Sequence, residues 1–291
     1  MIPFEMAEPA SLKEAVAMLD PQEPTVRPVA GGTGLMLMMK AGVFRPTRLV
    51  SLHRLEPEHA GIAMSDSGEC RIGALATLSQ LEHDGNIAAR FPVLKRALRT
   101  LSNPRVRNVA RVGGALAHGD PHMDLPPVLT ALAARITITG PKGTRELPLS
   151  DLYTGYYETV LERNELITAV RVPPLGGRRA AYVKVTARSA DDWPALGIAV
   201  SFMLKDGAVL DSVIVVSAAT EKVTRLPSAE RVLHSGRLDD QLLRHAGDAA
   251  AKEAILLSDA HGSAAYKREL LRVHLGRAVR LAADGTGARQ S

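Results

Sequence analysis

The chain is poor in the residues on which small redox and nucleic-acid-binding modules depend. Of its 291 residues one is a cysteine, Cys70, and only 3% are aromatic, with a single tryptophan, Trp193. One thiol cannot form an intramolecular disulfide, nor can it hold an iron–sulfur cluster, which takes about four thiolates. Any cluster must therefore belong to another chain. The shortage of aromatic rings leaves no base-stacking platform, so we expect no nucleic acid despite the net charge of +5.

Long apolar runs and a secretion signal are also missing. The sequence opens Met1-Ile2-Pro3-Phe4-Glu5, without a basic head and an apolar core behind it. No segment reaches the roughly 20 apolar residues that a membrane-spanning helix requires. We therefore expect a cytoplasmic protein without a transmembrane segment. The length and the 46% hydrophobic content allow more than one core, so two domains are expected.

The spacing of apolar and turn residues predicts helices and strands in separate blocks. In the first half we expect a helix at 11–19 capped by Ser11, a strand at 26–30, two helices within 79–101 punctuated by Gly85 and Pro92, and strands at 135–139 and 166–172. In the second half we expect strands at 181–186, 196–204 and 213–219 and a helical region at 239–282. Prolines and glycines at 173–177 mark a domain boundary. The order favours an α+β chain.

Two glycine-centred segments, both expected to be loops, adjoin apolar runs. They are Ala30-Gly31-Gly32-Thr33-Gly34 and Arg111-Val112-Gly113-Gly114-Ala115. Without Cβ atoms the backbone can approach phosphate oxygens, and successive N–H groups can converge on them, with the Thr33 hydroxyl as a further donor. Neither segment fits G-x-G-x-x-G or the lysine-containing P-loop. The residues alone leave a pyrophosphate site and two tight turns as alternatives.

A polar, rigid stretch follows the second segment. It reads His118-Gly119-Asp120-Pro121-His122-Met123-Asp124-Leu125-Pro126-Pro127 and so ends in two prolines. Two histidines and two aspartates suggest a metal, but Pro121 fixes the backbone between them and no further His or Cys group is near enough to complete a shell. We therefore expect a turn with Asx-type hydrogen bonds and no metal. Asp124 is then free to accept from a cofactor hydroxyl or ring N–H.

Six cations form the densest basic run of the chain. They are Lys95, Arg96, Arg99, Arg105, Arg107 and Arg111. We interpret them as a solvated helix face followed by a basic loop. The alternative is a surface for an anionic cofactor or an acidic partner.

Together the two glycine segments resemble the FAD loops of a known family, the medium flavoprotein subunits of molybdenum hydroxylases such as bacterial carbon monoxide dehydrogenase and xanthine dehydrogenase. The first match runs over 30–40 and the second over 103–124, and it continues through 165–173, 182–185 and 265–268. The resemblance implies a two-lobed FAD-binding domain of the xanthine dehydrogenase/vanillyl-alcohol-oxidase-like (PCMH) type at 1–175, with its lobes meeting near 55–60. A smaller α+β C-terminal domain at 178–285 and a frayed tail at 286–291 would follow.

The resemblance also implies a function in electron transfer. FAD would take electrons from the [2Fe-2S] clusters of a small subunit and pass them to an external acceptor, NAD, quinone or oxygen. Substrate would be oxidised at the molybdopterin of a large subunit, in an (αβγ)2 heterohexamer. No side chain of this chain is expected to be catalytic, because the flavin carries the redox chemistry.

Site residues carry over by position. The resemblance implies that 30–34 and 112–114 cradle the FAD pyrophosphate, that Asp124 contacts the flavin or adenosine, that Lys184 lies near the cofactor and that Trp193 lies against the isoalloxazine ring. The family usually has His-Ser at Thr33-Gly34 and Thr-Ile-Gly-Gly-Asn at 111–115, so a hydroxyl and an amide are lost at Arg111 and Ala115. The Arg111 guanidinium is a candidate to replace their hydrogen bonds with charge.

Two further hypotheses compete with this one. A stand-alone reductase of the kind that makes UDP-N-acetylmuramate has a related FAD fold and similar length, but its glycine-rich first motif is not found here. A basic nucleic-acid or scaffold module would account for the charge and leave the paired glycine segments unexplained.

Overall fold

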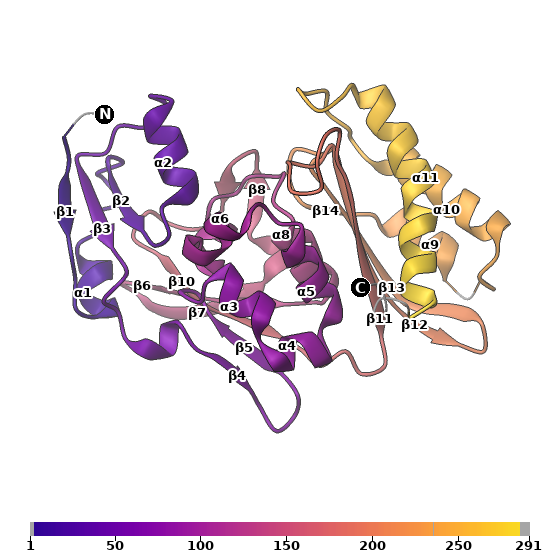
Figure 1. The fold of residues 1–291 in the computed structure, drawn as a ribbon, viewed down its shortest axis with the longest axis horizontal. Coiled ribbons are helices and arrows are strands. Elements are labelled where there is room, and N and C mark those ends of the chain that lie inside the picture. The colour runs from indigo at the N-terminus through magenta and orange to yellow at the C-terminus, as the bar shows by residue number, and fades with distance from the viewer. Residues whose placement is uncertain (1–2, 235, 286–291) are drawn as a thin grey trace.

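Three larger sheets follow one another along the chain, each with helices of its own (Figure 1). The computed structural model describes residues 3–234 and 236–285. The expected tail at 286–291 lies outside this range. The first lobe is a parallel sheet in the order β1-β3-β2, formed by β1 (Glu5–Ala7), β2 (Val26–Val29) and β3 (Arg48–Ser51). Its crossovers carry α1 (Leu12–Ala17), capped as predicted by Ser11, and α2 (Thr33–Lys40).

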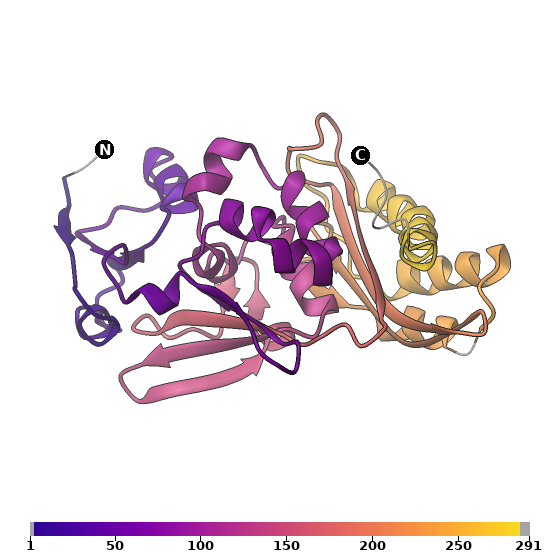
Figure 2. The same ribbon diagram turned by 60° about the horizontal axis from the view of Figure 1, so that its bottom comes forward.

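The central lobe is an antiparallel sheet with helices gathered on one face (Figure 2). The strand order is β4-β5-β10-β6-β7, formed by β4 (Ile62–Met64), β5 (Cys70–Gly73), β6 (Arg135–Gly140), β7 (Gly143–Pro148) and β10 (Leu166–Val172). The helices are α3 (Leu78–His83), α4 (Gly85–Arg90), α5 (Pro92–Arg99), α6 (Pro104–Val109), α7 (Val112–Ala117) and α8 (Leu125–Ala131). The short hairpin of β8 (Tyr153–Gly155) and β9 (Glu158–Thr159) and the turns η1 (Pro57–His59) and η2 (Leu149–Asp151) complete it.

The C-terminal part is a four-stranded antiparallel sheet buried on both faces. It consists of β11 (Arg179–Val185), β12 (Leu196–Lys205), β13 (Ala208–Ser217) and β14 (Thr224–Arg225), with α9 (Pro227–Leu233), α10 (Asp240–Glu253) and α11 (Ala264–Ala283). Ile198 and Val200 belong to the core beneath these helices, whereas Ala199 and Val215 join the core of the central lobe. Because strand side chains alternate, one sheet serves two cores.

Four predictions about the elements were wrong in detail. The region 79–101 forms three helices rather than two, because Gly85 and Pro92 each begin a new one and Asp84 caps the second. β13 begins at Ala208 rather than 213, since Asp206 and Gly207 both take positive φ, 52° and 80°, and make a tight hairpin. The helical region 239–282 is interrupted at 254–263. Residues 104–109 form α6 rather than a basic loop.

Candidate functional site

The fold brings the two glycine segments together. A Cβ on Gly31 would lie 2.3 Å from the carbonyl oxygen of Val109, and one on Gly34 would lie 2.9 Å from the imidazole of His118. Residues 30–34 therefore pass directly over the end of α6 and beside the end of α7, where no side chain fits. These two glycines are required by packing between protein segments as well as by any ligand.

The turn at Gly32 leaves a row of backbone amides without acceptors in the described part of the protein. Gly32 has φ 68° and is the N-cap of α2, a conformation that glycine adopts without a steric penalty. The first hydrogen bond of the helix is from the Met36 N–H to the Gly32 carbonyl. In residues 3–234 and 236–285 the N–H groups of 31–35 find no protein acceptor. Such a row of unpaired donors at a helix N-terminus suits an anion.

The second glycine segment was expected to be a loop, and that expectation was wrong. Arg111 is the N-cap of α7, and the helix forms because Val112 and Leu116 are completely buried in the central core. The N–H groups of Val112 and Gly113 already donate to the carbonyls of Ala76 and Ala74, at 3.0 and 2.7 Å. Those two amides are thus used by the fold and are not available to a pyrophosphate.

Gly114 differs from its neighbours. A Cβ on Gly113 would lie 2.6 Å from the Ala74 side chain, whereas one on Gly114 would meet nothing within 4 Å. Gly114 lies in the first turn of α7, and its φ is not positive. Neither packing nor backbone conformation therefore calls for glycine here. The space beside Gly114, in the first turn of α7, is therefore left open by the protein.

The two departures from the family pattern behave differently. The Arg111 Nη1 donates to the Leu75 carbonyl at 2.8 Å, and burial lowers the pKa of this guanidinium. The guanidinium has five N–H donors, so this bond leaves others for an anion. Ala115 is 7% exposed and packs in the protein, so its side chain offers nothing to a ligand.

Of the six cations in the basic run, Arg107 is buried in an ion pair with Glu82 at 2.8 Å and is not on a solvated face.

Asp124 and Lys184 form a buried ion pair across the junction between the central lobe and the C-terminal sheet. Lys184 Nζ lies 2.9 Å from Asp124 Oδ2, and the two side chains are 8% and 5% exposed. The hydroxyl of Tyr182 donates to Asp124 Oδ1 at 2.6 Å, and Lys184 also donates to the carbonyl of Thr100 at 2.7 Å. Burial raises the pKa of Asp124, and the charge of Lys184 opposes that rise. The structure therefore brings these two predicted site residues into direct contact with each other.

Sequence patterns missed Tyr182 and the Thr100 carbonyl as partners of this pair. Tyr182 precedes Lys184 by two positions on β11, so the two side chains lie on one face of the strand. That periodicity could have identified Tyr182. A backbone carbonyl such as that of Thr100 carries no sequence signal.

Trp193 lies on the loop between β11 and β12. Its side chain is not core, because the residue is 49% exposed. The indole stacks on the imidazole of His122, with ring centroids 5.8 Å apart and planes 17° apart. A large, half-exposed aromatic surface thus remains available to a flat ligand ring.

The polar stretch 118–124 forms the predicted Asx-type turn. Asp120 Oδ1 accepts from the backbone N–H of His122 at 2.9 Å and from its Nδ1 at 3.0 Å. Among the residues that the structure describes, no group of three or more His, Cys, Asp or Glu side chains is arranged to hold a metal ion. Burial raises the pKa of the Cys70 thiol to about 11.

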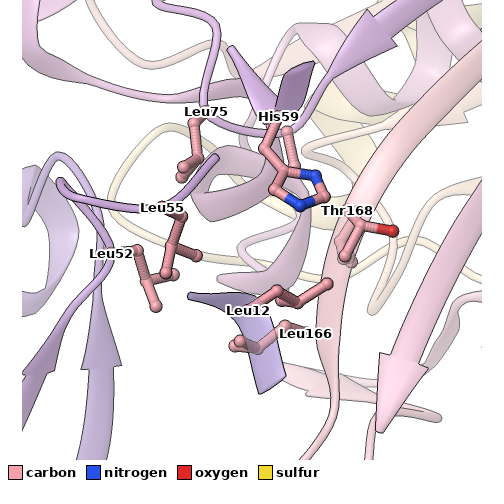
Figure 3. Close-up of a pocket in the computed structure, with 9 residues that line it drawn as sticks. Leu12, Leu52, Leu55, His59, Leu75, Leu166 and Thr168 are labelled. Atoms are coloured by element: carbon pink, nitrogen blue, oxygen red, sulfur yellow. The ribbon is translucent and has the colours of Figure 1, made fainter. Parts of the chain in front are cut away.

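A small cavity lies where the first and central lobes meet (Figure 3). Its volume is about 10 Å³, and its walls are mostly leucines with His59 and Thr168. Within the described ranges the Nδ1 of His59 has no hydrogen-bond partner. The space is far too small for any ring of a dinucleotide, so it is not the cofactor site.

Comparison with known proteins decides the family. A model of the FAD binding domain in molybdopterin dehydrogenase matches residues 2–175, and one of the CO dehydrogenase flavoprotein C-terminal domain matches 181–282. The chain belongs to the FAD-binding medium subunits of the molybdenum hydroxylases. This result confirms the family, the α+β fold and the FAD cofactor expected from the sequence, and it overturns the stand-alone reductase and nucleic-acid hypotheses.

Relatives of full length support the assignment. The chain is 31% identical to the glyceraldehyde dehydrogenase medium chain of Sulfolobus acidocaldarius, covering 93% of this chain and 95% of the relative. It is 32% identical to the carbon monoxide dehydrogenase medium chain of Afipia carboxidovorans, covering 96% and 97%. A chain of carbon monoxide dehydrogenase from Hydrogenophaga pseudoflava superposes with a TM-score of 0.93 at 33% identity, covering 98% and 99%. No helix in the described part is long and apolar enough to cross a membrane.

Proposed function

We propose that this medium subunit binds the FAD pyrophosphate between the N-terminus of α2 and Gly114. The observation that carries the proposal is the combination of unpaired amides at 31–35 with the open space at Gly114. The amides supply hydrogen bonds to anionic oxygens, and the positive end of the α2 dipole adds to them. Arg111 contributes charge from its remaining donors. Ala30, Val112, Gly113 and Ala115 then act through the backbone, by shaping the two segments.

On this proposal, Asp124, Lys184 and Trp193 define the flavin end of the site. The Asp124–Lys184 pair fixes the C-terminal sheet against the central lobe and keeps polar atoms beside the cofactor. Trp193 presents its exposed ring to the isoalloxazine and shields it from water. Bound FAD supplies the redox chemistry, accepting electrons singly and releasing them singly or as a pair.

We further propose that the chain works in a complex. An iron–sulfur small subunit would deliver electrons, a molybdopterin large subunit would oxidise the substrate, and NAD, quinone or oxygen would receive the electrons. The single cysteine supports this division, since the chain cannot hold a cluster. We also propose that the complex is an (αβγ)2 assembly in the cytoplasm. The chain itself would divide into a domain at 1–175, whose two lobes meet near 55–60, and a domain at 178–285.

Purification of the tagged chain from its native host tests the proposal. We expect a yellow complex containing an iron–sulfur chain and a molybdopterin chain, and substrate oxidation by the complex. The isolated FAD-loaded chain should not oxidise organic substrates but should be reoxidised by an external acceptor after chemical reduction. Substrate turnover by the isolated chain, or purification of the chain as a stable monomer lacking both partners, would refute the electron-transfer role.

A further inference from the structure

Four charged side chains form a continuous row from the central lobe into the C-terminal domain. His122 Nδ1 lies 3.0 Å from Asp120 Oδ1, and His122 Nε2 lies 3.1 Å from Asp259 Oδ2. Asp259 Oδ2 in turn accepts from Lys267 Nζ at 2.6 Å. Lys267 is completely buried, and Asp259 lies in the 254–263 segment that interrupts the helical region. This row is a second connection between the two domains, besides the Asp124–Lys184 pair.

The hydrogen-bond pattern requires His122 to carry a positive charge. An ionised carboxylate only accepts hydrogen bonds, so a ring nitrogen facing one must bear a proton, and His122 faces a carboxylate with each nitrogen. The row then holds two negative and two positive charges and is neutral overall. A neutral imidazole would leave one uncompensated negative charge in a largely buried place. Burial alone lowers the pKa of His122, but the hydrogen bonds and charges of Asp120 and Asp259 outweigh it and raise the pKa.

The same imidazolium lies under the indole of Trp193. The nearly parallel stack at 5.8 Å places a cation against the face of the most electron-rich ring among the side chains. The backbone N–H of Trp193 is held by Asp192, whose carboxylate accepts at 2.9 Å. His122 therefore contacts three parts of the molecule at once: the turn at Asp120, the segment at Asp259 and the β11–β12 loop that carries Trp193.

We propose that His122, in its charged form, is a positioning residue that holds Trp193 in place and clamps the C-terminal domain to the central lobe. Loss of the proton leaves one nitrogen without a donor for its carboxylate, removes the cation from beneath the indole and releases the loop. The role of Trp193 at the flavin rests on the proposed function, whereas the clamp itself does not. Access of the external electron acceptor to the flavin at this edge then depends on pH, because His122 loses its proton as the pH rises.

Other titratable or charged groups face the row. They are His118 and Tyr157 near Asp120, His261 beside both rings, and Asp192 at the loop. His261 is the important competitor, because its ring centroid lies 5.5 Å from that of His122 and 6.4 Å from that of Trp193. Any experiment on the tryptophan must separate these two histidines.

An imidazole NMR titration of the full chain, with bound FAD and again after FAD removal, tests the charge. The sequence has nine histidines, and His122→Gln identifies the resonance by its disappearance. We expect His122 to titrate above its ordinary value of 6.5. In Asp259→Asn, which keeps an oxygen acceptor and removes the charge, the midpoint should fall by about 1 to 3 units. A midpoint at or below the ordinary value, or one unmoved in Asp259→Asn, overturns the proposal.

Emission from Trp193, the single indole, tests the stack. In the same full chain after FAD removal, emission should rise with pH at the midpoint found by NMR. His261→Asn should keep this transition and His122→Gln should abolish it. If His122→Gln does not fold, the transition in Asp259→Asn must move together with the NMR midpoint. A transition that follows His261 instead contradicts the positioning role. A chain that shows the transition but binds no FAD refutes only the proposed function.

Discussion

Gly114→Ala should separate the needs of the fold from those of the cofactor. Glycine costs a helix about 0.5–1 kcal/mol relative to alanine, and the added methyl group meets no protein atom within 4 Å. The FAD-free variant should therefore be slightly more stable than the parent chain. Its melting temperature should rise by roughly 1–4 °C. A packing or turn role for this glycine predicts the opposite sign.

The same methyl group would occupy the space that we assign to phosphate oxygens. Loss of one hydrogen bond to a charged group costs about 1.5–3 kcal/mol, and every 1.4 kcal/mol is tenfold in affinity. FAD should therefore bind roughly 10- to 150-fold more weakly. The matched control is Gly85→Ala, because Gly85 is also an exposed helical glycine with no atom within 4 Å of its missing Cβ, and it lies in α4. It should gain similar stability and keep its FAD affinity.

Titration of the FAD-free chains with FAD, followed by flavin absorbance and by melting temperature, gives both quantities on one sample. The reasoning is refuted if Gly114→Ala binds FAD within about twofold of the parent, or if Gly85→Ala loses as much affinity. Gly32→Val is a poorer test, because Gly32 has φ 68° and a branched residue there disturbs the backbone itself.

Three further predictions concern the rest of the site. Lys184→Met should lower the free energy of unfolding, measured in urea, by about 3–5 kcal/mol, because it leaves Asp124 buried and unpaired. The double variant Lys184→Met/Asp124→Asn should recover much of that loss. As a control, Lys142→Met in the exposed pair with Glu162 should change the free energy of unfolding by less than about 0.5 kcal/mol. Equal losses in the single and double variants would contradict a pairing role. Arg111→Thr should weaken FAD binding about tenfold with little change in stability, and unchanged affinity would mean that Arg111 serves only the Leu75 carbonyl. Removal of FAD should raise Trp193 emission, and equal emission from the folded FAD-loaded and FAD-free proteins would exclude ring contact. Because the side chain is 49% exposed, Trp193→Ala should change the rate of flavin reoxidation more than it changes the free energy of unfolding.

Local patterns predicted the elements that local chemistry controls. Ser11 caps α1, and Asp120 forms its turn with His122, because each bond spans only a few residues. The Asp-Gly pair at 206–207 is also a typical hairpin turn. Because the prediction did not use it, the predicted start of β13 was too late in the sequence. All of these interactions join residues that are close together in the sequence.

Long-range packing decided the rest. Arg111 to Ala115 read as a loop because two glycines disfavour a helix, yet burial of Val112 and Leu116 makes α7. The helical region breaks at 254–263, where Asp259 bonds to His122, far away in sequence. Likewise the sequence could not show that Gly31 and Gly113 serve protein contacts while Gly114 faces open space. Only the assembled backbone distinguishes these glycines.

The shared use of β12 and β13 by two cores bears on how the cofactor is loaded. The central lobe completes its core with Ala199 and Val215, which lie on strands of the C-terminal sheet. Lys184, which neutralises Asp124 in the central lobe, is also on that sheet. During synthesis the ribosome releases the glycine segments long before these strands. A nascent chain that already displays both segments is therefore still an unfinished flavoprotein, and stable uptake of FAD has to wait until most of the polypeptide has been made.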